Sequence, residues 1–502
     1  MIVGVANVPQ LRVSTLDDRP VRERGDFVVY WMVANRRRRH NFALQRAAEL
    51  ASKLQKPLVV LEALRCDHRW ASARFHAFVL AGMRDHAREF ADGKALYWPY
   101  VEPSPGAGKG LLAALGERSC AVVTDEYPCF FVPRMQRAAA TDIRSRLEVV
   151  DASGLLPLRV GQQAPTRAYL FRRLLQKALP VHLQDRPLPD PLLGLKAKLP
   201  SSLPEPVAKR WPRASEALLA ADPQELARLP IDHEVKPVTA IPGGPLAGRE
   251  LLLGFLESRL ARYSEERNHP DADASSGLSP YLHFGHLGTH EILHELAEHE
   301  SWTPAKVAGQ VTGKALGWWG MSPNAEAFLD QVVTWRELGF HECHFHPDTY
   351  DQLESLPAWA QRTLAEHASD PREHVYTLGQ LEAGKTHDVL WNAAQSQLVR
   401  EGRIQNYLRM LWGKKVLEWS KTPKAALAAL VELNNKYALD GRDPNSYTGI
   451  LWCLGKFDRP WAPQRPVYGM VRYMSSDNTK RKLDLEHYLE ANAPRRQRGL
   501  FS

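Results

Sequence analysis

Cysteine is scarce in this sequence. Only five occur among 502 residues, and no two of them form a CxxC pair. An odd and scattered set indicates reduced thiols, which are typical of the cytosol, rather than a disulfide framework. Because the C-terminal half contains only Cys343 and Cys453, it cannot hold an iron–sulfur cluster on four cysteines.

Long apolar runs are also missing. No stretch is long enough to span a bilayer, and the N-terminus MIVGVANVPQLRV lacks the basic region followed by an apolar one that marks a signal peptide. The run His341–His346 (HECHFH) fits no common zinc spacing, so we predict no metal site. These absences predict a cytoplasmic, globular protein with no membrane partner. Its 502 residues leave room for two or three domains.

Acidic residues are fewer than basic ones, and the formal net charge is +8. A positive balance favours a polyanionic partner such as nucleic acid, although many basic proteins bind none. Ten of the fourteen tryptophans lie beyond residue 300. The aromatic chemistry is therefore expected in the C-terminal half.

Residues 25–155 alternate short apolar segments with helical patterns, which predicts a doubly wound α/β domain with a parallel sheet. Ligands bind such sheets at the carboxyl ends of the strands. No GxGxxG follows the first strand, and Gly106–Gly110 lacks the spacing of a phosphate loop, so a surface loop is expected there. The run Arg36–His40 is interpreted as a solvated helix start. The expected strands are 26–31, 57–61, 95–98, 121–125 and 147–151, with a helix over 41–54 between the first two.

The domain prediction has three parts. Residues 1–155 form the α/β domain, the proline-rich residues 156–245 form an interdomain linker, and residues 246–502 form a helical domain. Within the last part, apolar residues recur at helical spacing from 403 to 419 and predict an amphipathic helix. A dense polar loop, 434–445, follows it. Taken singly, these features are compatible with core packing and a surface turn.

The order of the motifs changes that interpretation. The chain reads LSPYLHFG at 278–285, LWNAAQ at 390–395, YLRM at 407–410, KKVLEW at 414–419, LDGRDPN at 439–445 and DRPW at 458–461. This series closely resembles the photolyase/cryptochrome family, and within it the class II cyclobutane pyrimidine dimer photolyases. The resemblance is weak before residue 160 and strong from about residue 250 onward.

The resemblance implies an enzyme that repairs UV-damaged DNA with blue light, using FAD to pass an electron to a flipped-out pyrimidine dimer. It also implies an all-α FAD-binding domain, a monomer, and a possible antenna chromophore, a deazaflavin or FMN, in the α/β domain. Arg409 and Asp440 match the family's ion pair beside the flavin. Asn434 matches the amide that faces flavin N5, with Asn445 as the alternative. The other cofactor positions implied are Tyr263, Ser275, Ser276, Gly277, Leu278, Ser279 and Arg442.

The lesion and relay residues are implied in the same way. Trp335 and Trp452 match walls that stack on the dimer, with Arg267 and Arg472 as DNA contacts. Gln331 stands where family members commonly carry a Glu that bonds the dimer, which puts efficient repair in doubt. The electron relay implied is Trp412, Trp391, Trp419 and, as terminal donor, Tyr376, although the same rings are compatible with plain core packing.

Two alternatives stay open. A cryptochrome-like photoreceptor would keep FAD and the tryptophans but usually carries a C-terminal tail, for which the sequence after Tyr488 leaves little room. A flavin-free DNA-binding module would purify as a colourless protein.

Overall fold

A computed structural model describes residues 7–196, 199–200 and 202–494. The chain forms two compact units, and neither is continuous in sequence. Unit 1 consists of Met1–Gln162, Lys177–Gly254 and Leu278–Gly309, and unit 2 of Gln163–Gln176, Phe255–Gly277 and Gln310–Ser502. The units therefore divide the chain differently from the three consecutive ranges expected from the sequence.

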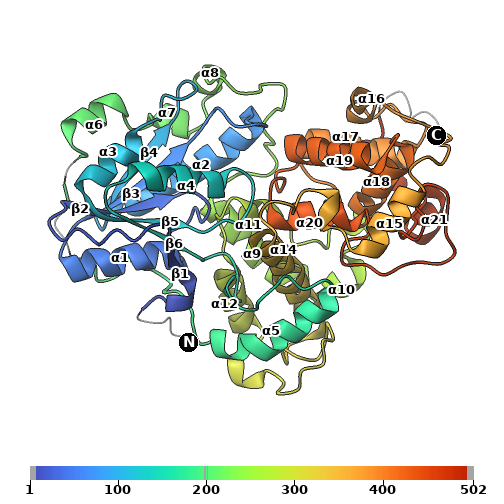
Figure 1. The fold of residues 1–502 in the computed structure, drawn as a ribbon, viewed down its shortest axis with the longest axis horizontal. Coiled ribbons are helices and arrows are strands. Elements are labelled where there is room, and N and C mark those ends of the chain that lie inside the picture. The colour runs from blue at the N-terminus through green and yellow to red at the C-terminus, as the bar shows by residue number, and fades with distance from the viewer. Residues whose placement is uncertain (1–6, 197–198, 201, 495–502) are drawn as a thin grey trace. The chain divides into compact units, whose positions relative to one another are not determined.

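Unit 1 contains a six-stranded sheet in the order β1-β6-β5-β2-β3-β4. All neighbouring pairs are parallel except β1 with β6. The predicted doubly wound parallel sheet is confirmed, and Figure 1 shows its strands among helices α1 to α4. The short antiparallel edge strand β1 was not predicted. The strands are β1 (Val13–Thr15), β2 (Phe27–Met32), β3 (Leu58–Leu64), β4 (Leu96–Val101), β5 (Ser119–Asp125) and β6 (Arg146–Val150).

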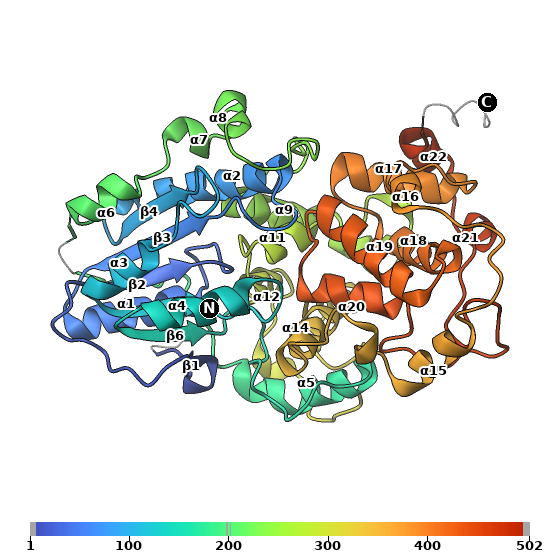
Figure 2. The same cartoon turned by 45° about the horizontal axis from the view of Figure 1, so that its top comes forward.

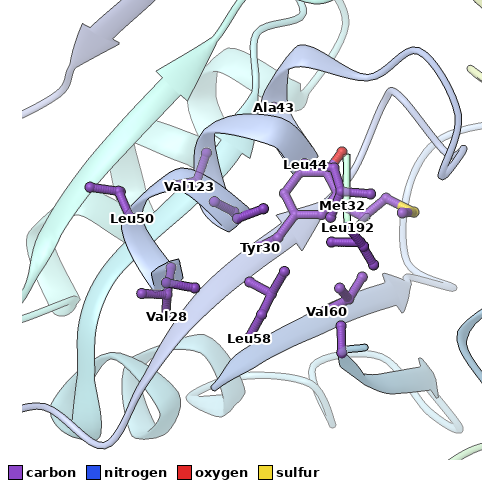
Figure 3. Close-up of a cluster of buried hydrophobic side chains, with 14 of the residues drawn as sticks. Val28, Tyr30, Met32, Ala43, Leu44, Leu50, Leu58, Val60, Val123 and Leu192 are labelled. Carbon is purple, nitrogen blue, oxygen red and sulfur yellow. The ribbon is translucent and has the colours of Figure 1, made fainter. Parts of the chain in front are cut away.

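The burial of β2 in the core of unit 1 agrees with its central place in the sheet. Every residue of β2 (FVVYWM) is buried, as expected for a central strand covered on both faces. Helix α1 begins at the cap Asn41, whose side chain accepts hydrogen bonds from the main-chain N–H groups of Ala43 and Leu44. Figure 3 shows Ala43, Leu44 and Leu50 of α1 against side chains of β2 and β3. Burial of each leucine or valine side chain in this core stabilises the unit by about 1.5–3 kcal/mol.

Segments from later in the chain complete unit 1. A Cβ added to Gly243 would lie 2.0 Å from the carbonyl oxygen of Phe78, so the chain passes directly against α2 at this point. The Phe78 ring contacts the rings of Tyr281 and Phe284 at centroid distances of 5.4 and 5.0 Å. The helices of this unit are α1 (Phe42–Leu54), α2 (Ala73–Glu89), α3 (Leu111–Arg118), α4 (Val132–Asp142), α6 (Glu205–Arg210), α7 (Glu216–Leu219), α8 (Pro223–Ala227), α11 (Ser279–His283) and α12 (Thr289–His299).

The interpretation of Arg36–His40 as a solvated run is wrong. Arg37 and His40 are only 2% and 3% exposed. The Arg37 guanidinium donates to the carbonyl oxygens of Gly285 and Ala152. Arg38 pairs with Asp190 at 2.8 Å. Arg37 and His40 are buried, whereas Arg36, Arg38 and Arg39 are half-buried. Carbonyl groups and a carboxylate from distant segments accept the hydrogen bonds of Arg37 and Arg38.

Unit 2 is largely helical, as predicted. Helices α17 to α20 pack in succession and lie side by side in Figure 2. Helix α5 (Ala168–His182) and helix α9 (Pro245–Ser258) each contribute residues to both units. The remaining helices are α10 (Tyr263–Glu266), α13 (Pro323–Leu329), the π-helix η6 (Asp330–Trp335), α14 (Arg336–Phe345), α15 (Ala358–Glu366), α16 (Leu378–Glu382), α17 (Val389–Glu401), α18 (Asn406–Trp419), α19 (Pro423–Tyr437), α20 (Pro444–Trp452), α21 (Ser476–Lys482) and α22 (Glu486–Asn492).

Single 3₁₀ turns join these elements. No helix in the described part of the chain has the length and apolar character needed to cross a membrane. The 3₁₀ turns are η1 (Gln10–Arg12), η2 (Phe90–Asp92), η3 (Leu260–Arg262), η4 (Pro270–Ala272), η5 (Pro304–Lys306) and η7 (Leu353–Ser355).

Candidate functional site

Helix α18 carries the centre of the candidate site. It begins three residues later than predicted, after Gln405, whose side-chain oxygen accepts hydrogen bonds from the N–H groups of Tyr407 and Leu408. The same side chain donates to the carbonyl oxygen of Arg267 at 2.8 Å. This cap anchors the first turn of α18 and so fixes the position of Arg409.

Arg409 and Asp440 form a two-pronged ion pair. Nη1 lies 3.0 Å from Oδ2, and Nη2 lies 2.9 Å from Oδ1. Nη2 also donates to the side-chain oxygen of Asn434. Burial opposes the charge of Arg409, but the Asp440 carboxylate outweighs it and raises the pKa of the guanidinium. With the side chains 21% and 19% exposed, the pair is held within the protein but remains open to a ligand.

Polar residues in the last turn of α19 and in the loop after it hydrogen-bond one another, so the predicted polar loop 434–445 begins within the helix. The Asn434 amide nitrogen donates to the Asn435 side chain at 3.1 Å and to Ser446 at 2.7 Å. The Arg442 main-chain N–H donates to Asn435 at 2.9 Å, and the Arg442 guanidinium donates to the Asn435 carbonyl oxygen. Asn434 and Arg442 are therefore buried, at 2% and 3% exposure, whereas Asn445 is exposed. The two hydrogen bonds from Arg442 to Asn435 thus close the loop, with the Arg442 side chain buried within it.

Four aromatic rings form a continuous series beside the ion pair. The rings of Trp412 and Trp391 stack at a centroid distance of 6.3 Å. Trp391 meets Trp419 at 5.5 Å, and Trp419 meets Tyr376 at 5.4 Å. The three tryptophans are almost fully buried, while Tyr376 is partly exposed. The series begins three residues from Arg409 on α18 and ends near solvent.

The predicted lesion residues occupy two places in unit 2. Gln331 and Trp335 lie in the π-helix η6, an uncommon turn that often marks functional positions. Their neighbour Asp330 pairs with Arg172 at 2.7 Å, and the Arg172 guanidinium lies 5.8 Å from the Trp335 ring. Trp452 ends α20, and Arg472 lies 5.9 Å from its ring.

The other predicted cofactor residues from Tyr263 to Ser279 are divided between the two units. Tyr263 is buried against Phe328, and Arg267 lies 5.6 Å over its ring. Ser275, Ser276 and Gly277 form the end of one segment of unit 2, and Leu278 and Ser279 begin a segment of unit 1. Ser279 is the first residue of the short helix α11, and its N-cap Leu278 makes no side-chain cap.

Sequence reasoning missed three residues of this region. Gln395 accepts a hydrogen bond from the Trp412 indole N–H at 2.9 Å, and it ends the LWNAAQ motif, four residues after Trp391. Arg172 was missed because it lies far away in the chain. Lys414 is fully buried, its Nζ lies 5.2 Å from the Trp452 ring, and burial lowers its pKa to about 8.

The donors around Arg409 fit the ring system of a flavin. The bonds to Asp440 and Asn434 use three of its five N–H groups, so within the described part of the chain two remain for a ligand. A guanidinium fixed by a carboxylate can bind a planar group that carries negative charge. The indole of Trp412 on the same helix provides an oxidisable ring close by.

Comparison with solved structures defines the class of fold. The chain superposes on a bacterial class III photolyase from Agrobacterium tumefaciens with a TM-score of 0.67 at 16% identity, covering 95% of this chain and 87% of that one. It superposes on a cryptochrome from Synechocystis sp. PCC6803 with a TM-score of 0.61 at 15% identity, covering 93% and 88%. The fold is that of the photolyases and cryptochromes.

Comparison with curated sequences narrows this to one family. The chain is 35% identical to the deoxyribodipyrimidine photo-lyase of Oryza sativa subsp. japonica over 93% of its own length and 87% of the relative's. It is 32% identical to that of Methanothermobacter thermautotrophicus over 98% of both chains. No family model matches the sequence. The chain belongs to the deoxyribodipyrimidine photo-lyase family, which is a family of enzymes.

Proposed function

We propose that this protein is a light-driven DNA repair enzyme that splits cyclobutane pyrimidine dimers in UV-damaged DNA. The observation that carries the proposal is the aromatic series from Tyr376 to Trp412, which ends on the helix that holds the Arg409–Asp440 ion pair. The family relationship supports the same conclusion.

FAD is the cofactor that we propose for this site, and when bound it supplies a light-excited electron to the dimer. Arg409 would hold the negatively charged edge of the flavin ring, and Asp440 would keep the guanidinium charged and oriented. Asn434 is the amide proposed for flavin N5. Because this amide already bonds Ser446 and Arg409, its orientation is fixed. Tyr263 and Ser275, Ser276 and Gly277 are the proposed unit 2 contacts for the rest of the cofactor, with Leu278 and Ser279 following them in the chain.

The tryptophans would return the cofactor to its reduced form. An indole gives up an electron readily, and the three buried rings lie at successive centroid distances of 6.3 and 5.5 Å. Tyr376 then reaches solvent, and its hydroxyl hydrogen-bonds the His387 ring nitrogen at 2.7 Å. An imidazole in that position can accept the phenol proton when the tyrosine is oxidised.

The lesion would be read by stacking and charge. Trp335 and Trp452 offer ring faces to a flipped-out dimer, and Arg267 and Arg472 supply positive charge to the DNA backbone. Gln331 can donate a hydrogen bond to a pyrimidine carbonyl, but it cannot transfer a proton as a carboxylic acid would. We propose that the enzyme acts as a monomer. The possible antenna, a deazaflavin or FMN, would bind unit 1.

Gln331 favours a second candidate, a cryptochrome-like photoreceptor that is photoreduced without repairing DNA. One experiment separates the two. The purified protein is tested for a flavin absorption spectrum, and the chemically reduced protein is then illuminated with blue light on an oligonucleotide that contains one thymine dimer. Repair establishes the photolyase. A yellow, photoreducible protein without repair establishes the photoreceptor, and a colourless protein that cannot be reconstituted with FAD rejects both.

A further inference from the structure

The two inner tryptophans of the aromatic series donate their indole N–H groups to very weak bases. Nε1 of Trp412 donates to the side-chain oxygen of Gln395 at 2.9 Å, and Nε1 of Trp391 donates to the main-chain carbonyl oxygen of Trp412 at 3.0 Å. Both rings are buried away from water. An indole that has lost an electron becomes acidic at this nitrogen, but neither an amide oxygen nor a peptide carbonyl takes up a proton readily. Each ring therefore keeps its proton when it is oxidised.

The hydrogen bonds of Gln395 fix which end of its amide faces the indole. Nε2 donates to the carbonyl oxygen of Glu382 at 3.2 Å, so Oε1 is the atom that meets the N–H of Trp412. Gln395 is fully buried in α17 and lies four positions after Trp391. Residues at this spacing share one face of a helix, so α17 holds both the ring face and the N–H group of Trp412.

The outer end of the series differs because a base lies against it. The hydroxyl oxygen of Tyr376 accepts the main-chain N–H of His387 at 3.0 Å and lies 2.7 Å from Nδ1 of the same residue. With its oxygen occupied in this way, the hydroxyl donates its own proton to Nδ1. Partial burial, followed by the charge of the neighbouring His374, lowers the pKa of His387, so its imidazole is a neutral base at pH 7. His387 is exposed and can exchange protons with water.

We propose that Gln395 keeps the indole proton on Trp412 during light-driven electron transfer, so that the positive charge moves outward and a proton leaves only at Tyr376. The proposal rests on the electron relay of the proposed function and adds a residue that controls its protons. A Trp412 ring that lost its proton would become a neutral radical, which takes an electron from Trp391 only if it also regains a proton. The charge would then stop at the first ring.

Electrons and protons balance along this path. One electron leaves Trp412 for the proposed flavin, and electrons from Trp391 and then Trp419 refill the ring before them without movement of a proton. In the last step Tyr376 gives one electron to Trp419 and its phenol proton to His387. The products are a neutral tyrosyl radical and an imidazolium ion, which releases its proton to water. A thiol in solution returns a hydrogen atom to the tyrosyl radical.

The test places a base beside the inner indole of the full-length, FAD-loaded protein and records the radicals by transient absorption after a blue flash. In Gln395→His the imidazole Nε2 is about as far from the main chain as the amide oxygen, and burial keeps the imidazole neutral and basic. We expect a neutral tryptophan radical in place of the radical cation. The yield of the Tyr376 radical should fall at least about tenfold, which corresponds to about 1.4 kcal/mol.

Two controls separate the added base from a general disturbance. Gln395→Met keeps the side-chain volume but adds no base, and it should form the Tyr376 radical in wild-type yield. Gln224→His makes the same exchange at an exposed position of α8 and should also behave as the wild type. A measurement without light uses protein that contains nitrogen-labelled tryptophan. Gln395→Met should shift the magnetic resonance signal of the Trp412 indole N–H, which is the signal missing from Trp412→Phe.

The outer end is tested in the wild type and in His387→Asn. In heavy water the inner steps of the wild type should keep their rates, while formation of the Tyr376 radical slows. In His387→Asn, which lacks the base, the tryptophan radical cation should persist and the Tyr376 radical should be lost. A neutral tryptophan radical in the wild type, or a wild-type yield of the Tyr376 radical in Gln395→His, overturns the proposal. A wild type that forms no tryptophan radical rejects the relay itself, whereas repair by chemically reduced protein is measured separately.

Discussion

Trp391 and Trp412 stack with their ring planes only 6° apart, and the Trp391 indole N–H donates to the Trp412 carbonyl oxygen at 3.0 Å. Trp391 thus holds Trp412 in two ways, by stacking on its ring and by a hydrogen bond to its main chain. Trp391 is fully buried and Trp412 is 2% exposed. Because water cannot reorganise around either ring, this arrangement suits rapid electron transfer as well as stable packing.

The variant Trp412→Phe keeps a large apolar ring but removes the easily oxidised indole. We expect light-driven reduction of the flavin to fall to background, while repair persists once the flavin has been reduced chemically. Photoreduction is followed by absorbance under blue light. The matched control is Trp318→Phe, because Trp318 is 3% exposed and lies in the same unit outside the series. Normal photoreduction in Trp412→Phe would assign Trp412 to the core alone.

The variant Asp440→Asn keeps the shape of the carboxylate but removes its charge. Arg409 then lacks its counter-charge, and the loss of one charged hydrogen-bonding partner in such a setting costs about 1–3 kcal/mol. We expect lower FAD content after purification and a lower unfolding midpoint. Asp477→Asn, on the exposed side of α21, serves as the control. Full FAD retention in Asp440→Asn would mean that the ion pair lies away from the cofactor.

The variant Gln331→Glu restores the acid that is common in the family, with nearly unchanged shape. If this Glu is protonated in the pocket, the repair yield per absorbed photon should rise, because a shared proton stabilises negative charge on the dimer. If it is ionised, the yield should fall at high pH. Both proteins are compared with pre-reduced flavin from about pH 6 to 9, the range that a carboxyl pKa raised by burial can reach. Identical yields and dimer affinities throughout would show that Gln331 does not touch the lesion.

Affinity for DNA should fall as salt rises, since cationic side chains displace counterions from phosphates. Arg472 lies 4.9 Å from the Trp461 ring and is exposed, so it can reach a backbone. For Arg472→Gln we expect a logarithmic salt slope that is smaller by about one, measured by fluorescence anisotropy. Dimer-containing DNA should bind more tightly than intact duplex. Equal binding of both duplexes at every salt concentration would argue against a repair enzyme.

Unit 1 should lose stability in mild acid because of His40. Burial, followed by the charge of Arg39, lowers the pKa of His40 from 6.5 to about 3. The unfolded chain therefore binds a proton between these values that the folded chain does not. Stability is complete above about pH 6.5 and falls toward pH 3 by about 1.4 kcal/mol per pH unit. His40→Asn should flatten the dependence of stability on pH, measured by urea unfolding, because it removes the imidazole that titrates. Asn is chosen because it tolerates the positive φ of 47° at this position. The control is the exposed His299→Asn, and an unchanged slope in His40→Asn would assign the acid sensitivity to other groups.

The sheet and the centre of the candidate site could be predicted from local sequence patterns. The strands around Val28 and Val59 are short apolar runs, and such runs are typical of strands in a sheet that is covered on both faces. The pairing of Arg409 with Asp440 followed from motifs that were long and in order. Helix α18 was placed to within three residues, but it is buried on nearly all sides from Leu411 to Leu417 and not along one apolar stripe.

Long-range packing could not be predicted in the same way. The burial of Arg37 depends on the carbonyl group of Gly285, which lies 248 positions away in the chain. The same is true of Arg172 and Asp330, which meet across 158 positions. The π-helical turn at Gln331 could not be predicted either, because its apolar spacing resembles that of an ordinary helix. Sequence periodicity reports which face is apolar, but not which distant segment covers it.

The loop closed by Arg442 has a consequence for how a cofactor would bind. The main-chain N–H and the guanidinium of Arg442 already donate to Asn435, and the Asn434 side chain is already bonded to Ser446 and Arg409. A planar ligand arriving beside Arg409 would meet side chains that have already lost their rotational freedom. The entropy of ordering them is part of folding, so association can proceed with little induced fit and with more of the contact energy retained as affinity.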